Sequence, residues 1–222
     1  NKGKHIFCEK PMALGIAECD RMLEAAEKAG VTLMVGQVLR LIPVFWQSHK
    51  IATGGDIGKP FAINITRLSS WWFGPGWRSQ KAKSGGVVYE VHVHELDFMR
   101  HVLGEAESVY ASMGHFTAAG VDYEDTAFIQ IRFRNGGIGS LHCGISSSVN
   151  QYGMTIQCTE GTLVNEGFGK RLQYARFGES HQVIEPEMIT LEEPYRAELG
   201  SWAQHILHAE PMVFDASDGR AA

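Results

Sequence analysis

One lysine of this sequence is placed where it can act on a bound ligand. Lys10 stands in the segment Glu9-Lys10-Pro11, directly after the short apolar run at 5–8. That run predicts a strand, and the strand must end at Pro11 because proline has no backbone N–H. Ligands of open α/β sheets bind beyond the carboxyl ends of the strands, so Lys10 can reach a cofactor and a substrate hydroxyl together. A solvated surface lysine beside a turn is the alternative.

A second group of polar residues, Glu90, His92 and His94, has two interpretations. In a strand, all three side chains share one face and can bind a divalent metal, which would suit a metal-dependent isomerase or hydrolase. In a helix, Glu90 and His94 are one turn apart and His92 points elsewhere. The helix is favoured, because apolar residues continue the helical spacing as far as Gly104.

The helical interpretation makes His94 a candidate general acid or base. Glu90 would accept one ring N–H of His94, which would fix its tautomer and raise its basicity. The alternative is a histidine that pairs with a carboxylate on a partly exposed helix and serves stability only.

The loop at 69–84 combines aromatic residues with glycines and a proline. Trp71, Trp72 and Trp77 can stack on the apolar face of a sugar ring, and Arg78 can bind a phosphate or hydroxyl groups. The alternative is that the tryptophans are buried against the sheet or against another subunit.

The first elements that must position these residues form a strand–helix–strand unit at 5–8, 16–29 and 32–35. Such a unit has parallel strands but cannot bury itself. We therefore expect residues 1–37 to be the end of a larger doubly wound sheet, most of which would precede this sequence.

Residues 38–222 predict a second α/β domain, with a helix at 39–52, a strand at 60–68 and a closing amphipathic helix at 195–208. Asn135-Gly136 predicts a hairpin. An antiparallel meander is expected after Gly104, with strands at 107–114, 125–134, 137–146, 152–158, 161–166 and 171–177. The fold class is thus α/β (α+β), with a large, mainly antiparallel open sheet flanked by helices.

Composition excludes several classes of protein. The 222 residues are 44% hydrophobic and 20% charged, which is typical of globular rather than disordered chains. The net charge of -5 argues against a nucleic-acid partner. No apolar run approaches the roughly 18 residues that cross a membrane. The four cysteines are scattered, so we expect reduced thiols and a cytoplasmic protein.

In their order these motifs resemble the glucose–fructose oxidoreductase / inositol dehydrogenase / MocA family over nearly the whole chain. The segments that carry the resemblance are Glu9-Lys10-Pro11, Val35-Gly36-Gln37, Trp77-Arg78, Ser84-Gly85-Gly86, Asp125-Thr126-Ala127 and Asp218-Gly219-Arg220. Two positions depart from the family pattern: Glu90 replaces an aspartate, and His92 stands where the family commonly has glycine.

The resemblance implies an oxidoreductase that uses NAD or NADP to transfer a hydride to or from a secondary alcohol of a sugar, cyclitol or related polyol. Lys10 and His94 take the positions of the family's lysine and proton-accepting histidine, and Glu90 that of the motif's aspartate. The implied cofactor contacts are Glu9, Lys10, Pro11 and Gln37. The implied substrate contacts are Trp72, Trp77, Arg78 and His92.

The resemblance also implies that residues 1–37 are the end of a dinucleotide-binding Rossmann domain, and that the protein is a homo-oligomer formed through the open sheet. We expect no metal at the site. No G-x-G-x-x-G phosphate-binding motif occurs, so we expect residues 1–222 alone to bind NAD(P) poorly and to be inactive. A non-catalytic binding or dimerisation module of the same fold is the remaining alternative.

Overall fold

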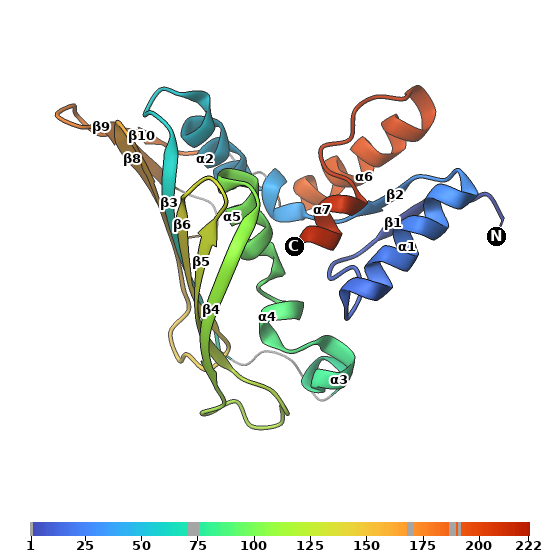
Figure 1. The fold of residues 1–222 in the computed structure, drawn as a ribbon. Coiled ribbons are helices and arrows are strands. Elements are labelled where there is room, and N and C mark those ends of the chain that lie inside the picture. Colours follow the sequence, from blue (N-terminus) through green and yellow to red (C-terminus); the bar gives the residue numbers. More distant parts are fainter. Residues whose placement is uncertain (1, 71–75, 168–170, 187–189, 191) are drawn as a thin grey trace.

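The computed structural model describes residues 2–70, 76–167, 171–186, 190 and 192–222. Its strands form two separate sheets, one small and one large, with helices between them (Figure 1). Strands β1 (Ile6–Cys8) and β2 (Leu33–Val35) make up the small sheet. The α/β fold with a large, mainly antiparallel sheet is confirmed.

The predicted strand–helix–strand unit is confirmed in β1, α1 (Ile16–Ala29) and β2. The strands are parallel, with Ile6 opposite Leu33. Gly30 ends α1 in the left-handed conformation at a φ of 62°, as expected for a glycine C-cap. Because both strands point the same way, Lys10 and Gln37 each follow two residues after a strand at the same edge of the sheet.

The large sheet has eight strands in the order β10-β9-β8-β7-β3-β6-β5-β4. All neighbours are antiparallel except β3 and β6. The strands are β3 (Pro60–Leu68), β4 (Ala106–Gly114), β5 (Thr126–Phe133), β6 (Ile138–Gly144), β7 (Gln151–Cys158), β8 (Gly161–Glu166), β9 (Arg171–Arg176) and β10 (Gln182–Ile184).

The prediction of a simple meander is wrong, because β3 lies between β6 and β7. The connection at 145–150 is long enough to pass over one strand, since neighbouring strands are only about 4.8 Å apart. Central placement suits β3, whose Ile63 and Ile65 are 2% and 0% exposed. The hairpin at Asn135-Gly136 is confirmed by the antiparallel pairing of β5 with β6.

Helices cover one face of this sheet (Figure 1). The helical segments are η1 (Val38–Leu41), α2 (Pro43–Gly54), η2 (Trp77–Ser79), α3 (Lys81–Ser84), α4 (Val87–Glu90), α5 (Val93–Leu103), α6 (Glu192–His208) and α7 (Ala216–Ala221). Phe45 of α2 and Phe98 of α5 pack edge to face at 5.1 Å over the core. Along β5 the buried Ile129 and Ile131 alternate with exposed residues, so the other face carries polar and apolar side chains outward.

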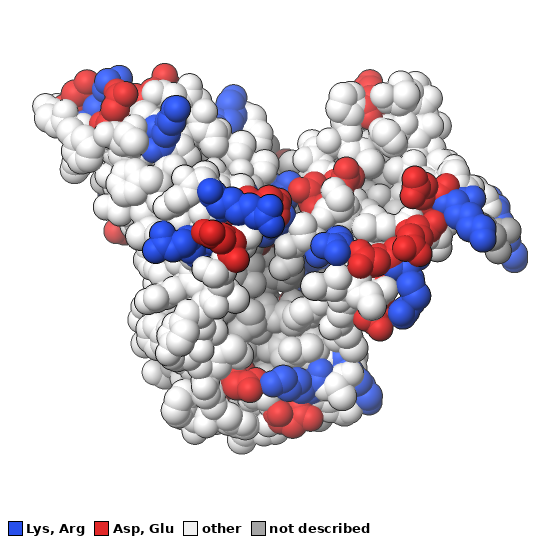
Figure 2. All heavy atoms as spheres, in the orientation of Figure 1, with Lys and Arg blue, Asp and Glu red and all other residues white. Residues whose placement is uncertain are grey.

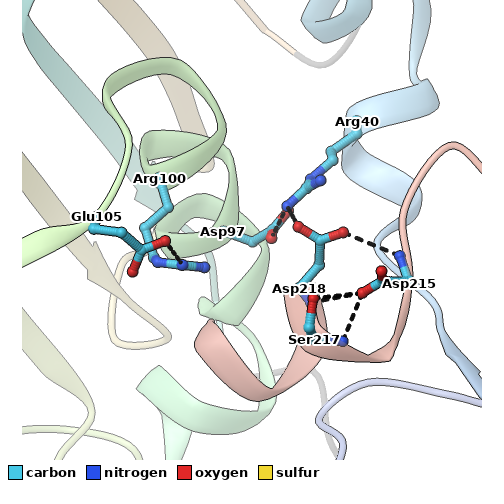
Figure 3. Close-up of polar contacts among 7 residues, drawn as sticks. All are labelled: Arg40, Asp97, Arg100, Glu105, Asp215, Ser217 and Asp218. Carbon is cyan, nitrogen blue, oxygen red and sulfur yellow. Dashed lines mark hydrogen bonds and ion pairs between the residues drawn. The ribbon is translucent and has the colours of Figure 1, made fainter.

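A buried arginine, Arg40, links α5 to η1 and α7 (Figure 3). Arg40 of η1 donates to Asp97 of α5 through Nε at 2.7 Å and through Nη2 at 2.6 Å. Nη2 also donates to Asp218 of α7 at 2.9 Å. Asp218 completes a capping box with Asp215 at the start of α7. Side chains from three distant parts of the chain thus meet at Arg40, and they fix α5.

Asp97→Asn is expected to lower the free energy of unfolding by about 3 kcal/mol, because Arg40 stays buried while losing its bidentate anionic partner. The matched control is Glu105→Gln. It removes an ion pair with Arg100 of the same helix, but the Glu105 side chain is 64% exposed, so the loss should stay below about 1 kcal/mol. Denaturant unfolding of both variants measures the difference. Equal losses would contradict the role given to Arg40.

Candidate functional site

Glu90 brings Lys10 and Arg78 together. The Lys10 ammonium donates to the main-chain oxygen of Glu90 and lies 3.8 Å from its Oε1. Arg78 Nε lies 3.3 Å from the same Oε1, while Glu90 is only 5% exposed. Trp77 adds a cation–π contact, with its ring centroid 5.2 Å from the Arg78 guanidinium carbon. Four of the predicted site residues therefore share one location.

The electrostatics of Lys10 suit a group that binds a ligand. Burial lowers the pKa of Lys10, and the negative charge of Glu90 partly offsets this effect. An ammonium group has three N–H donors. Lys10 can therefore hold Glu90 and still donate to an oxygen of a ligand.

His94 lines a cavity of about 190 Å³ together with Arg67, Tyr195 and apolar residues of η1. Burial, and after it the positive charge of Lys10, lowers the pKa of His94 to about 3. The imidazole is therefore neutral near pH 7. Lys10 and this cavity flank the same break between α4 and α5, because Lys10 contacts Glu90, and Arg67 of the cavity donates to the main-chain oxygen of Val91.

The predicted hydrogen bond between Glu90 and His94 is not found in the described part of the chain. Helix α4 ends at Glu90 and α5 begins at Val93, so the two residues do not share one continuous helix. Glu90 contacts Lys10 and Arg78, and Nδ1 of His94 is buried without a partner. The prediction that Glu90 orients His94 is therefore wrong, and Glu90 holds Lys10 instead.

His92 is 0% exposed and does not line the His94 cavity. The interpretation that its ring contacts the substrate is therefore not supported. Its Nδ1 lies 3.2 Å from Oε2 of Glu95, which is also 0% exposed. Oε1 of Glu95 accepts hydrogen bonds from Arg67 at 2.9 Å and from Tyr152 at 3.2 Å.

The alternative metal site at Glu90, His92 and His94 does not form. Glu90 and His92 contact different partners, as described above. Within the described ranges, no group of three or more His, Cys, Asp or Glu side chains is arranged to hold a metal ion. The helical backbone of this segment separates side chains that a strand would have aligned.

Three residues of this network, Arg67, Glu95 and Tyr152, escaped the sequence analysis. Arg67 could have been found, since it continues the alternation of Ile63 and Ile65 on the inward face of β3. An arginine at an inward position needs a buried acidic partner. Tyr152 carries no comparable signal, because aromatic residues are ordinary in strands.

Gln37 belongs to a second buried polar cluster, at the carboxyl end of β2. It is 1% exposed, and both of its side-chain amide atoms lack hydrogen-bond partners. Glu198 of α6 lies close by, since a Cβ on Gly36 would be 3.0 Å from its Oε1. Burial, and then the charge of Glu9, raises the pKa of Glu198 to about 7. The cluster therefore holds buried hydrogen-bond donors and acceptors without partners, and it lies near Glu9, which directly precedes Lys10.

Three further predicted site residues are exposed or half-buried. Glu9 is exposed and Pro11 is half-buried, in the loop after β1. Trp77 is 51% exposed, so it is not buried against the sheet. Trp72 lies outside the described residues.

Several global features accompany this site. All four cysteines are free thiols. Of the helices in the described residues, none is both long enough and apolar enough to span a membrane. On the face shown in Figure 2, acidic and basic side chains are interspersed rather than separated into patches of one sign.

Two family models match this chain. The model described as "GFO/IDH/MocA C-terminal domain" covers residues 45–164. The model described as "Oxidoreductase family, NAD-binding Rossmann fold" covers residues 1–37.

Curated relatives and solved structures agree with these models. The chain is 31% identical over 167 residues to a 2,7-anhydro-N-acetylneuraminate hydratase of Escherichia coli (strain K12), which is 72% of this chain and 44% of that protein. It is 27% identical to a myo-inositol 2-dehydrogenase of Thermotoga maritima, in an alignment that covers 99% of this chain and 67% of that protein. A levoglucosan dehydrogenase in complex with NADH superimposes with a TM-score of 0.88 at 25% identity, over 98% of this chain and 68% of that one.

The chain spans about half the length of several curated relatives that it matches. One family model alone covers residues 45–164, which is more than half of the 222 residues. The resemblance drawn from the ordered motifs is confirmed, and the chain belongs to the GFO/IDH/MocA family of oxidoreductases.

Proposed function

We propose that this chain is part of an NAD(P)-dependent oxidoreductase that transfers a hydride between nicotinamide and a secondary alcohol of a sugar, cyclitol or related polyol. The observation that carries the proposal is that Lys10, held by Glu90, and the cavity lined by His94 flank the same break between α4 and α5. The relatives named myo-inositol 2-dehydrogenase and levoglucosan dehydrogenase support the substrate class.

We assign the cofactor to the edge formed by residues 1–37, and the substrate to residues 38–222. Gln37 fits this assignment, because a buried amide with no partner is satisfied by a ligand that both donates and accepts. The carboxamide of nicotinamide is such a group. Glu9, Lys10 and Pro11 follow the adjacent strand and would complete this edge.

Alcohol oxidation needs an acceptor for a hydride and another for a proton. Bound nicotinamide supplies the hydride acceptor. His94 is neutral and can take the hydroxyl proton. Lys10 stabilises the negative charge that grows on the substrate oxygen as the O–H bond breaks. Glu90 keeps the lysine in place through its main-chain and side-chain oxygens.

The cavity beside His94 indicates a small substrate. Its volume of about 190 Å³ is below the roughly 300–1,000 Å³ of pockets that take drug-sized ligands. Trp77 and Arg78 would supply a stacking surface and hydrogen-bond donors to hydroxyl groups. A single polyhydroxylated ring fits this combination best.

A second candidate is hydration or dehydration of an anhydro-sugar, since two of the relatives are named 2,7-anhydro-N-acetylneuraminate hydratases. Product analysis by mass spectrometry separates it from net oxidation. A full-length protein that binds NAD(H) but converts no sugar or polyol would favour the non-catalytic alternative.

Lys10→Met and His94→Gln in the full-length protein should each lower kcat/KM at least about 100-fold, because each removes a group that acts on the reacting hydroxyl. The assay follows NAD(P)H formation with myo-inositol and levoglucosan. Lys83→Met and His208→Gln change exposed residues of the same types and should leave turnover unchanged. Near-normal turnover in both site variants would refute the assigned roles.

We also propose that a second copy of the protein covers the outer face of the large sheet. Tyr110, Phe128 and Ile138 are exposed there, at 49–69%. A hollow of about 590 Å³ runs across the same strands. A hollowed face that exposes aromatic and aliphatic side chains among polar ones suits an interface, and pairing with an identical face satisfies two-fold symmetry.

Phe128→Glu should dissociate the oligomer, because it places a charge among these exposed side chains without touching the core. Light scattering coupled to size exclusion measures the mass, which should fall to that of a single chain. Leu207→Glu, at a 69% exposed position on α6 away from the sheet, is the control and should not change the mass. A monomeric wild type, or a variant of unchanged mass, would contradict the proposed interface.

A further inference from the structure

The residues that line the cavity beside His94 divide by the element that carries them. The polar ones are His94 of α5, Arg67 of β3 and Tyr195 of α6. A continuous apolar stretch comes from η1 and its C-terminal cap, and consists of Val38, Leu39 and Ile42. We call these three residues the η1 wall. The cavity thus combines a few polar groups with one aliphatic surface.

The η1 wall is firmly built into the protein. Val38, Leu39 and Ile42 are 8%, 2% and 8% exposed. Leu39 and Ile42 also belong to the core beneath the large sheet. Arg40 stands between them and donates to Asp97 of α5 through two nitrogens. The wall therefore cannot move away from the cavity without breaking these contacts.

The polar groups of the cavity suit only part of a sugar ring. His94 is assigned to the reacting hydroxyl. Arg67 donates to Oε1 of Glu95 at 2.9 Å and to the main-chain oxygen of Val91 at 3.4 Å. Tyr195 is 47% exposed and offers one phenolic hydroxyl, which both donates and accepts. Substrate hydroxyls find partners beside these residues, and the aliphatic side chains of the η1 wall offer none.

The small size of the cavity brings the substrate against the η1 wall. The volume is about 190 Å³, so a sugar ring that reaches His94 also touches the aliphatic lining. A hydroxyl directed at the wall loses its water and gains no hydrogen bond from a side chain there, which weakens binding. An edge of C–H groups, or one in which an ether bridge replaces hydroxyls, leaves fewer polar groups unpaired.

We propose that the substrate presents an edge without hydroxyl groups to the η1 wall, which selects an anhydro or deoxy sugar over a fully hydroxylated hexose or cyclitol. This rests on the proposed function and narrows its substrate class. The reacting hydroxyl lies at His94 and the hydroxyl-free edge lies at Val38, Leu39 and Ile42. The wall determines specificity only, because aliphatic side chains neither bind a proton nor hold a charge.

The first test compares how three compounds bind to the full-length wild-type protein, with NADH or NADPH bound to prevent turnover. Levoglucosan is glucose with two hydroxyls replaced by an anhydro bridge, and myo-inositol carries a hydroxyl on every ring carbon. A hydrophobic pocket rejects an added hydroxyl by up to roughly 100-fold. Titration calorimetry should therefore give levoglucosan a Kd about tenfold or more below those of D-glucose and myo-inositol. Equal or tighter binding of either one would overturn the proposal.

The second test changes the wall itself with Val38→Thr. Threonine keeps the branched shape of valine and adds a hydroxyl that can pair with a substrate hydroxyl. The ratio of the Kd of D-glucose to that of levoglucosan should fall about tenfold, and the KM for the cofactor should stay within about twofold. A folded variant with an unchanged ratio would overturn the proposal, as would a change confined to cofactor affinity.

Val102→Thr is the matched control. Val102 lies on α5, is 7% exposed, and does not line the cavity. Its substitution should leave the binding ratio unchanged. Denaturant unfolding compares the stability of the two variants, and if Val38→Thr does not fold, the wild-type comparison alone decides.

The binding measurements keep this proposal separate from the proposed function. If levoglucosan binds most tightly but is not oxidised with NAD(P)⁺, the dehydrogenase proposal fails and the specificity of the η1 wall stands. If the protein oxidises all three compounds and binds them equally well, the specificity proposal fails alone. A wild type that binds none of the three overturns the specificity proposal as well.

Discussion

The contact between Glu90 and Lys10 is the interaction on which the site depends. Lys10 follows strand β1 of the small sheet, and Glu90 ends α4, which packs on the side of the large sheet. The buried residue Glu90 offers two oxygens, one of its main chain and one of its carboxyl group, to one ammonium group. It also holds Arg78, so residues from three parts of the sequence meet around one acidic side chain. Without it, the largely buried ammonium group of Lys10 would lose its nearest carboxylate.

Two glutamates stabilise different charged groups of the site. Glu90 stabilises the cation Lys10, and Glu95 is paired with Arg67 and His92. Between them His94 is kept neutral, because it is buried beside a positive charge and no carboxylate bonds to its Nδ1. A neutral imidazole next to a cation is the arrangement that accepts a proton from a hydroxyl group while the developing oxyanion is stabilised. Arg40 and Asp97 hold the helix that carries it.

Much of the fold could be predicted from local patterns. The periodicity of residues 16–29, ended by Gly30, gave α1 with its observed bounds. Alternating runs gave the strands of the large sheet. Their order could not be predicted, because the insertion of β3 between β6 and β7 depends on pairing between residues that are 76–98 positions apart.

The residues of the candidate site could be proposed from the sequence, but their contacts could not. Lys10, Glu90 and His94 stand out by type and place in the chain. The spacing of Glu90 and His94 suggested a direct pair, and the break between α4 and α5 prevents it. Glu95 had no visible role, because its partners Arg67 and Tyr152 come from strands remote in sequence.

The most direct test of this account is a crystal structure of the full-length protein with NAD⁺ and a polyol bound. The account predicts that Lys10 Nζ and a ring nitrogen of His94 both lie within hydrogen-bond distance of the same substrate hydroxyl, next to the nicotinamide ring. A polyol bound elsewhere, with Lys10 and His94 facing different surfaces, would contradict it.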